Sequence, residues 1–324
     1  VRPYSRGDLY KAAWTPGQTD QWRCMADLTA KRNPRRIGIN VSDTFAFGDG
    51  LTASLKAKLV KYLGEKYTFR LCSAENVAVG WLEKRIPGEL EVYPQIAAIA
   101  HAIIAEAFSN RVITPGITTT SDVGWWMRKK IDQLGIKPWF HPWVDLQRMQ
   151  EGKPNESLTG VIQRGDLLHC DLGIIYLGLC TDTQEHAYVL KEDETDVPLG
   201  LKKALRLGNQ LQDIFTNEFK AGITGNQLLH NALSIAGKQG IRAQIYTHPL
   251  GFHGHGAGPV VGLWDHQDAV PGKGDYPLYC DTCYAIELNI KTSIPEWNEQ
   301  IVRIALEHDA VFTAKGIRYL DGRQ

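Results

Sequence analysis

The chain has 324 residues, of which 43% are hydrophobic and 22% are charged, a composition typical of a folded globular protein. Its 36 Lys and Arg residues balance 36 Asp and Glu residues, so no net positive charge favours a nucleic acid or an anionic membrane. No apolar run approaches the roughly 18 residues that would span a bilayer. We therefore expect a globular protein with neither a nucleic-acid partner nor a membrane partner, and a length that allows two domains.

The first 85 residues predict a small region of mixed α/β structure. The segment "RRIGINV" (35–41) is rich in β-branched residues and predicts a strand, and "LTASLKAKLVKYLGEKY" (51–67) has the pattern of an amphipathic helix. From about Pro87 the order of elements changes. The sequence therefore predicts two regions, 1–85 and 86–324.

Two helices follow in the second region, joined by the turn "TPGITTTSD" (114–122). Pro94 is predicted to occupy the first turn of the earlier helix, because proline is tolerated where no helical N–H bond is needed. Apolar residues then recur at helical spacing: Ile96, Ile99, Ile103 and Ala107 in the first helix, and Val123, Met127, Ile131 and Leu134 in the second. Gly135 is predicted to end the second helix.

The same order of elements occurs again further along the chain. A helix through Ala204, Leu207, Leu211 and Phe215 leads to the turn "KAGITGNQ", and another helix through Leu228, Leu229, Ala232 and Leu233 ends near Gly240. Both turns contain "GIT", at 116–118 and at 222–224, and strand-like segments follow each helix pair, "DLLHCDLGIIYLGL" and "CYAIELNI". This repetition predicts an internal duplication, with two similar halves facing each other across a cleft.

Two carboxylates in the first strand-like segment are candidate metal ligands. Asp171 and Asp182 flank Gly173 and Gly178, which would permit a bend, so two strands that fold back could bring both carboxylates to one face. Unpaired carboxylates on an apolar surface are costly, and a divalent cation would remove that cost. The alternative is an edge hairpin whose acids are solvated.

The histidine-rich stretch "THPLGFHGHGAGP" (247–259) allows several interpretations. A phosphate-binding glycine loop would need a helix directly after it or a G-K-[ST] ending, whereas Pro259 and "VVGLWDHQD" follow here. The pair Cys280 and Cys283 would need a second such pair to form a structural zinc site. Histidine beside carboxylates instead indicates borderline divalent metals. With Glu287 and Glu307, two Asp and one His give five ligands, which suit a pair of manganese, iron, cobalt or zinc ions.

The order Asp, Asp, His, Glu, Glu resembles metallopeptidase family M24, which includes methionine aminopeptidase, Xaa-Pro aminopeptidase, prolidase and creatinase. The resemblance covers roughly Pro87 to Gln324. It implies an α/β (α+β) protein with an internally duplicated pita-bread catalytic domain over residues 86–324 and two metal ions in its cleft. Residues 1–85 resemble part of the N-terminal domain of the creatinase and prolidase branch. That region is short for the domain, which predicts that part of the natural N-terminus is missing.

The resemblance implies roles for single positions. Asp171 and Asp182 match the two ligand aspartates. Glu287 matches the next glutamate ligand, although Leu288 and Asn289 stand where the family commonly has Pro-Gly. Glu307 matches the last ligand, with two extra residues between it and Arg303-Ile304.

The histidines leave a choice open. His248, Gly251 and His255 fit the family pattern of a ligand histidine followed by a second, catalytic histidine, and we favour this assignment; His253 is then a neighbour without a metal. The rival assignment makes His255 the ligand. The family also carries a histidine upstream of the first aspartate, where this chain has Lys153 and Pro154. His141 is the candidate for that role, or else a loop histidine packed beside tryptophans.

The resemblance therefore predicts a metal-dependent aminopeptidase or dipeptidase that acts on Xaa-Pro bonds. Two ions bridged by Asp182, Glu307 and Asp171 would generate hydroxide, Glu287 would transfer protons, and His255 would donate a hydrogen bond to the carbonyl oxygen. The alternatives are the same metal site acting on a non-peptide substrate, as in a creatinase-like hydrolase or a lyase, and a metal-free binding module. The nine tryptophans also allow an apolar interface between two copies in a homodimer.

Overall fold

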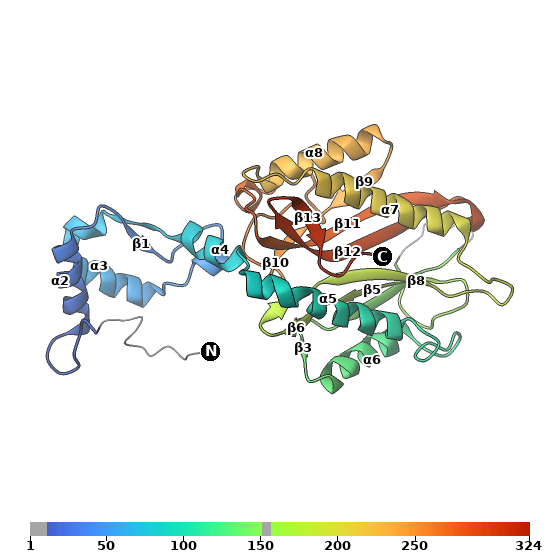
Figure 1. Ribbon diagram of the computed structural model, residues 1–324, viewed down its shortest axis with the longest axis horizontal. Helices are drawn as coiled ribbons and strands as arrows, with labels where there is room; N and C mark the ends of the chain where they lie inside the picture. Colours follow the sequence, from blue (N-terminus) through green and yellow to red (C-terminus); the bar gives the residue numbers. More distant parts are fainter. Residues whose placement is uncertain (1–11, 151–156) are drawn as a thin grey trace. The chain divides into compact units, whose positions relative to one another are not determined.

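The computed structural model describes residues 12–150 and 157–324 (Figure 1). Contacts among Cα atoms divide the chain into two units, Val1–Val79 and Gly80–Gln324. The domain boundary expected after residue 85 stays a prediction. Lys153 and Pro154, which stand where the family carries its upstream histidine, lie outside the described residues. Among those that are described, no helix combines the length and the apolar character needed to cross a membrane.

From residue 12 onward, where the description of the N-terminal unit begins, there are three helices, a short 3-10 helix and one pair of parallel strands. In chain order its elements are α2 Gln21–Arg32, β1 Ile37–Ile39, η1 Ala46–Gly48, α3 Ala53–Thr68, β2 Leu71–Ser73 and α4 Glu75–Glu83, the last of which runs across the division into the second unit. The predicted strand and helix both form. Gly64 interrupts α3, since its φ of 66° and ψ of 173° are not helical.

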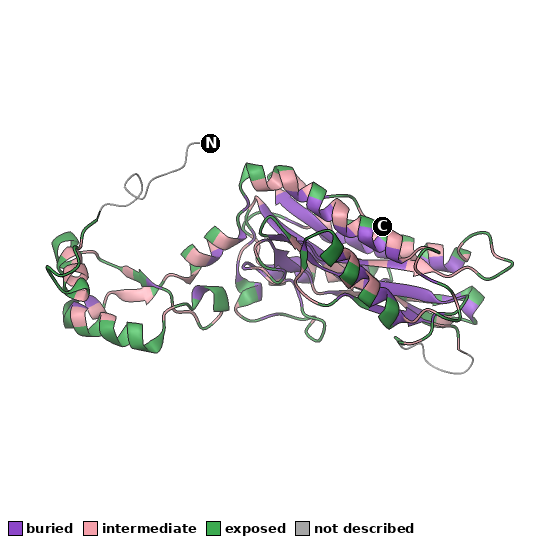
Figure 2. Ribbon diagram, turned by 90° about the horizontal axis from the view of Figure 1, so that it is seen from below, coloured by how far each residue is buried: buried purple, intermediate pink, exposed green. Residues whose placement is uncertain are grey.

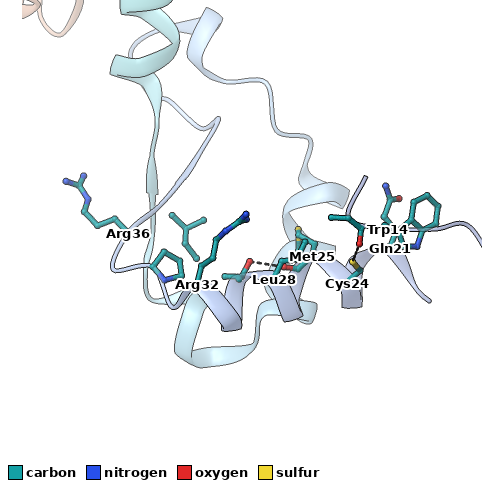
Figure 3. Close-up of a pocket in the computed structure, with 11 residues that line it drawn as sticks. Trp14, Gln21, Cys24, Met25, Leu28, Arg32 and Arg36 are labelled. Atoms are coloured by element: carbon teal, nitrogen blue, oxygen red, sulfur yellow. Dashed lines mark hydrogen bonds between the residues drawn. The ribbon is translucent and has the colours of Figure 1, made fainter. Parts of the chain in front are cut away.

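A cavity of about 420 Å³ lies in this unit, beside α2 and the chain that leads into β1 (Figure 3). Its wall combines apolar and sulfur-containing side chains with two arginines: Trp14, Cys24, Met25, Leu28, Arg32 and Arg36 are among the lining residues. Each group of potential metal ligands found among the described residues lies in the second unit. The chemistry predicted from the sequence therefore belongs to the second unit.

The second unit is built from four long helices and eleven strands within the part of the chain that is described. Its first half contains α5 Pro87–Ala107, α6 Thr120–Gln133, β3 Lys137–Pro138, β4 Trp143–Gln147, β5 Leu167–Leu172, β6 Ile174–Tyr176, β7 Leu179–Cys180 and β8 Thr183–Tyr188. Its second half contains α7 Leu199–Asn217, α8 Gly225–Lys238, β9 Arg242–Ile245, β10 His248–Leu250, η2 Lys273–Asp275, β11 Thr282–Ile294, η3 Pro295–Trp297, β12 Gln300–Thr313 and β13 Gly316–Tyr319.

One eight-stranded sheet joins the two halves. Its strands follow the order β10-β11-β12-β8-β5-β4, with β9 beside β11 and β13 beside β12, and every pairing in it is antiparallel. The long hairpin of β11 and β12 pairs from Thr282 with Phe312 to Ile294 with Gln300. Strands β3, β6 and β7 form a separate small sheet. The order shows that strands of the first and second halves meet where β12 lies beside β8.

Two hydrophobic cores lie against the sheet, each beneath the helix pair of one half. Leu211, Phe215 and Leu228 of α7 and α8 bury their side chains against β11 and β12 in one core. Ile103 and Met127 of α5 and α6 do the same against β4 and β5 in the other core. Figure 2 shows buried strands beneath helices whose outer turns are exposed. The predicted duplication of a helix pair followed by strands is thus confirmed.

The two "GIT" turns have matching backbone geometry. Gly116 and Gly222 adopt φ angles of 83° and 88°, a left-handed conformation that glycine reaches without a steric cost. The N–H of Gly116 donates to Ile162 O at 2.8 Å, and the N–H of Gly222 donates to Leu278 O at 2.9 Å. Each acceptor precedes the main strands of its own half. The shared tripeptide therefore marks the same turn in both halves.

The start of α5 differs from the prediction. The helix begins at Pro87 and not at Pro94, which lies inside it. Glu89 explains the earlier start, because its carboxylate accepts the N–H of Ile86 at 3.0 Å and so closes the first turn.

Candidate metal centre

Four polar residues from four neighbouring strands form one line across the sheet, called the central row below. Glu287 of β11 pairs with Glu307 of β12, Glu307 pairs with Gln184 of β8, and Gln184 pairs with Asp171 of β5. Residues that are directly opposite in antiparallel strands project from the same face. The central row therefore brings three of the predicted ligands to one face, although they are far apart in the sequence.

His248 and Asp182 lie against the central row. His248 pairs with Ala285, two residues before Glu287, so it projects from the same face of the sheet. Its Nε2 lies 3.5 Å from Asp182 Oδ2, 3.3 Å from Glu307 Oε1 and 3.9 Å from Glu287 Oε2. Asp182 directly precedes β8, and its N–H donates to Asp309 Oδ1 at 3.0 Å. All five residues predicted as metal ligands are therefore neighbours.

These side chains are poorly satisfied without a cation. Asp182, His248 and Glu307 are buried, and four buried atoms of the set have no hydrogen-bond partner: Asp171 Oδ1, Asp182 Oδ1, His248 Nε2 and Glu307 Oε1. Burial, reinforced by the charge of Glu307, raises the pKa of Asp171 to about 8 and raises the pKa values of Asp182 and Glu287. A cluster of this kind favours a bound positive charge, which a metal ion supplies.

The ligand atoms fall into three overlapping groups, in each of which the atoms lie within 4.8 Å of one another. The groups are Asp182 with His248 and His255, His248 with Glu287 and Glu307, and Asp171 with Asp182 and Glu307. Glu307 belongs to two groups and so does Asp182. Shared carboxylates of this kind can bridge two neighbouring ions, and carboxylate oxygen with imidazole nitrogen suits manganese, iron, cobalt or zinc. The residues present therefore fit a pair of divalent metals.

His255 lies beside the cluster on a loop that packs closely against Trp139. The ring centroid of His255 is 4.3 Å from that of His248 and 5.3 Å from that of Trp139. His255 is partly exposed, and its partial burial, together with the charge of His248, lowers the pKa of His255 to about 4. A Cβ on the neighbouring Gly254 would lie 2.3 Å from Trp139 Cε2, so only glycine allows this approach. The glycines of the loop thus bring His255 and Trp139 together.

His253 and His141 lie away from the three groups. His253 is exposed on the same loop as His255. His141 is exposed as well, and its ring lies 4.6 Å from that of Trp125 on α6. Neither histidine belongs to a group of potential ligands found among the described residues. The catalytic role of His141 stays a prediction.

The sequence interpretation missed two buried residues at the site. Gln184 occupies the middle of the central row, and Asp309 holds the backbone of Asp182. Both follow a predicted ligand by two residues, Gln184 after Asp182 and Asp309 after Glu307. Because side chains alternate between the faces of a strand, that spacing was the available signal.

Comparisons with known proteins identify the family and the fold of the chain. A family model described as metallopeptidase family M24 matches residues 92–314. The fold is similar to that of an X-Pro aminopeptidase from Thermotoga maritima, with a TM-score of 0.64 at 17% identity, over 95% of this chain and 79% of that one. It is also similar to a methionine aminopeptidase from Thermotoga maritima, with a TM-score of 0.52 at 22% identity, over 75% of this chain and 100% of that one.

Similarity in sequence to curated proteins is more limited. A Mycoplasma pneumoniae protein named "Putative Xaa-Pro aminopeptidase" is 23% identical over 171 residues, which are 53% of this chain and 46% of that protein. The matched part of this chain spans less than half the length of the curated relatives. The family match, in contrast, covers well over half of this chain, and the solved structures share its fold. The chain therefore belongs to metallopeptidase family M24 and has the pita-bread fold.

Proposed function

We propose that this protein is a peptidase that depends on two divalent metal ions and cleaves Xaa-Pro bonds as an aminopeptidase or dipeptidase. One observation carries the metal-dependent part: four unpartnered buried atoms of Asp171, Asp182, His248 and Glu307 lie together. The substrate class rests on names given to similar proteins, among them the X-Pro aminopeptidase of Thermotoga maritima. Fold and family similarity alone support that part of the proposal.

The proposal gives each ligand a place. Asp171, Asp182 and Glu307 would hold one ion, and His248, Glu287 and Glu307 would hold the other, with Asp182 close to both groups. When bound, the ions supply positive charge that polarises the peptide carbonyl and makes the attacking water more acidic. The favoured assignment of His248 as the ligand agrees with its place in two of the three groups.

In this proposal, residues of the chain transfer the protons and stabilise the carbonyl oxygen. Glu287 accepts a proton from the water that attacks the carbonyl carbon and passes it to the leaving nitrogen as the C–N bond breaks. His255, whose low pKa keeps it neutral, donates an N–H to the carbonyl oxygen, on which negative charge develops.

Hydrolysis of a peptide panel by protein loaded with manganese, cobalt or zinc tests the proposal. The panel holds Xaa-Pro dipeptides, longer peptides that start with Xaa-Pro, and peptides that start with Met. We expect cleavage of Xaa-Pro bonds that a chelator abolishes, and a loss of at least about 100-fold in kcat for Glu287→Gln, since general acid–base transfer alone contributes that much.

The other outcomes separate the alternatives. Preference for the peptides that start with Met would move the protein to the methionine aminopeptidase branch. Metal binding without cleavage of any peptide would favour a non-peptide substrate at the same site. A purified protein that binds no divalent metal would contradict the proposal and leave a binding module.

A further inference from the structure

Gln184 contacts both glutamates of the central row. Its side chain is buried, and its amide nitrogen donates to Glu287 Oε1 at 2.5 Å and to Glu307 Oε2 at 2.7 Å. Carboxylates that bind metal ions are ionised and only accept hydrogen bonds, so in the proposed metal centre the NH₂ group of Gln184 has to face both glutamates. Its carbonyl oxygen then points the other way.

Two further buried residues hold the amide in that orientation. His169 Nε2 lies 2.9 Å from Gln184 Oε1, so this ring nitrogen carries the hydrogen and donates it. The other ring nitrogen, Nδ1, lies 3.3 Å from Asp145 Oδ1 and forms an ion pair with it when both ring nitrogens carry a hydrogen. The Trp143 indole N–H donates to Asp145 Oδ2 at 3.2 Å. His169 is paired directly opposite Asp145 on the neighbouring strand, so both project from the same face. A chain of contacts thus runs from Asp145 through His169 to Gln184.

The Gln184 amide donates a hydrogen bond to one carboxylate oxygen of each glutamate and makes none to the other oxygen. The free oxygens are Glu287 Oε2 and Glu307 Oε1, and these are the atoms that face His248 Nε2, at 3.9 Å and 3.3 Å. Glu307 Oε1 is also one of the buried atoms with no hydrogen-bond partner. The amide of Gln184 therefore divides each carboxylate into an oxygen held by the protein and an oxygen turned toward the ligand groups.

We propose that Gln184 is a positioning residue, locked by His169 and Asp145, that determines which oxygens of Glu287 and Glu307 are presented to the metal ions. The inference rests on the proposed metal centre. Without the amide, each glutamate can rotate or offer both oxygens to one ion, which changes the coordination geometry. Residues that orient metal ligands typically contribute about 10- to 100-fold to metal affinity.

The test compares four variants of the full chain with the wild-type protein. Gln184→Met keeps the length of the side chain and removes the donor, and His169→Met removes the hydrogen bond that orients Gln184. His169→Gln keeps an N–H donor where Nε2 stood. Gln212→Met is the matched control, because Gln212 is a buried glutamine whose amide nitrogen lies 3.0 Å from the Nδ1 of a histidine, His308. His308 follows Glu307 in β12 and so projects from the opposite face of the sheet.

Calorimetric titration with Mn²⁺ of metal-free protein gives the affinity, and the visible spectrum of the Co²⁺-loaded protein reports the coordination geometry. We expect Gln184→Met and His169→Met to bind Mn²⁺ about 10- to 100-fold more weakly and to alter the Co²⁺ spectrum. His169→Gln and Gln212→Met should retain the affinity and the spectrum of the wild type.

Two results would overturn the inference, and they differ from each other. If Gln184→Met binds Mn²⁺ like the wild type with an unchanged Co²⁺ spectrum, the positioning role is wrong while the metal centre stands. If the wild type itself binds no Mn²⁺, the proposed metal centre is wrong and the inference is refuted with it. Should Gln184→Met fail to fold, the contrast between His169→Met and His169→Gln decides, since equal affinities would refute the role of His169.

Discussion

Replacing Glu83 by Gln should make the stability of this protein less dependent on pH. Glu83 ends α4 with only 4% of its surface exposed. Its Oε1 accepts the hydroxyl of Tyr276 at 3.2 Å, and its Oε2 has no hydrogen-bond partner. Burial raises the pKa of Glu83 from 4.5 to about 7, against the opposing effect of the Tyr276 hydroxyl. Each pKa unit corresponds to about 1.36 kcal/mol, so ionisation of the folded form costs about 3 kcal/mol.

The direction in which Glu83 changes stability with pH follows from its raised pKa. Because the folded-state pKa lies above the unfolded value, the contribution of Glu83 to stability is complete below pH 4.5 and is lost as the pH rises through about 7. Glu83→Gln removes the ionisation and keeps the size of the side chain. Relative to the wild type, the variant should therefore gain about 3 kcal/mol in unfolding free energy between about pH 4.5 and about pH 8.5.

Urea unfolding followed by circular dichroism at both pH values measures this gain. Both proteins are compared in the same metal-free buffer, so that other titrating groups cancel in the difference. The exposed Glu91 on α5 supplies the control, because Glu91→Gln removes one negative charge without changing a buried group. An advantage of Glu83→Gln over the wild type that is the same at both pH values would refute the reasoning.

Two further predictions concern the histidine-rich stretch 247–259. His248→Ala should weaken metal binding more than His255→Ala does, because His248 belongs to two ligand groups and His255 to one. His255→Ala should mainly lower kcat. Metal titration and steady-state kinetics measure the two effects, and the reverse ranking would support His255 as the ligand. Gly254→Ala places a Cβ 2.3 Å from Trp139 and should cost about 1–3 kcal/mol in thermal unfolding, whereas Gly237→Ala on α8 has open space and should be neutral or stabilising by up to about 1 kcal/mol. Equal effects of the two alanines would show that the loop has room.

Much of the fold could be predicted because its signals are local. Helical spacing of apolar residues predicted α6, α7 and α8, whose buried faces carry most of the expected side chains. Leu134 is an exception, since it follows the end of α6 and is exposed. The repeated turn predicted the duplication, because both "GIT" glycines need the same left-handed conformation. The start of α5 was predicted too late, because Pro87 and Pro94 could each occupy the first turn of a helix. Only the capping contact of Glu89 distinguishes them.

The sequence by itself determined which acids and histidines would form the cluster, since their order along the chain matches the family's. Only the tertiary structure decided how they meet. The central row depends on β12 lying between β8 and β11, and strand order is set by the packing of both helix pairs and not by any local pattern. The same sheet brought the amide of Gln184 within hydrogen-bond distance of both glutamates, and His169 against Gln184. These contacts join side chains on different strands, so no spacing within one strand could reveal them.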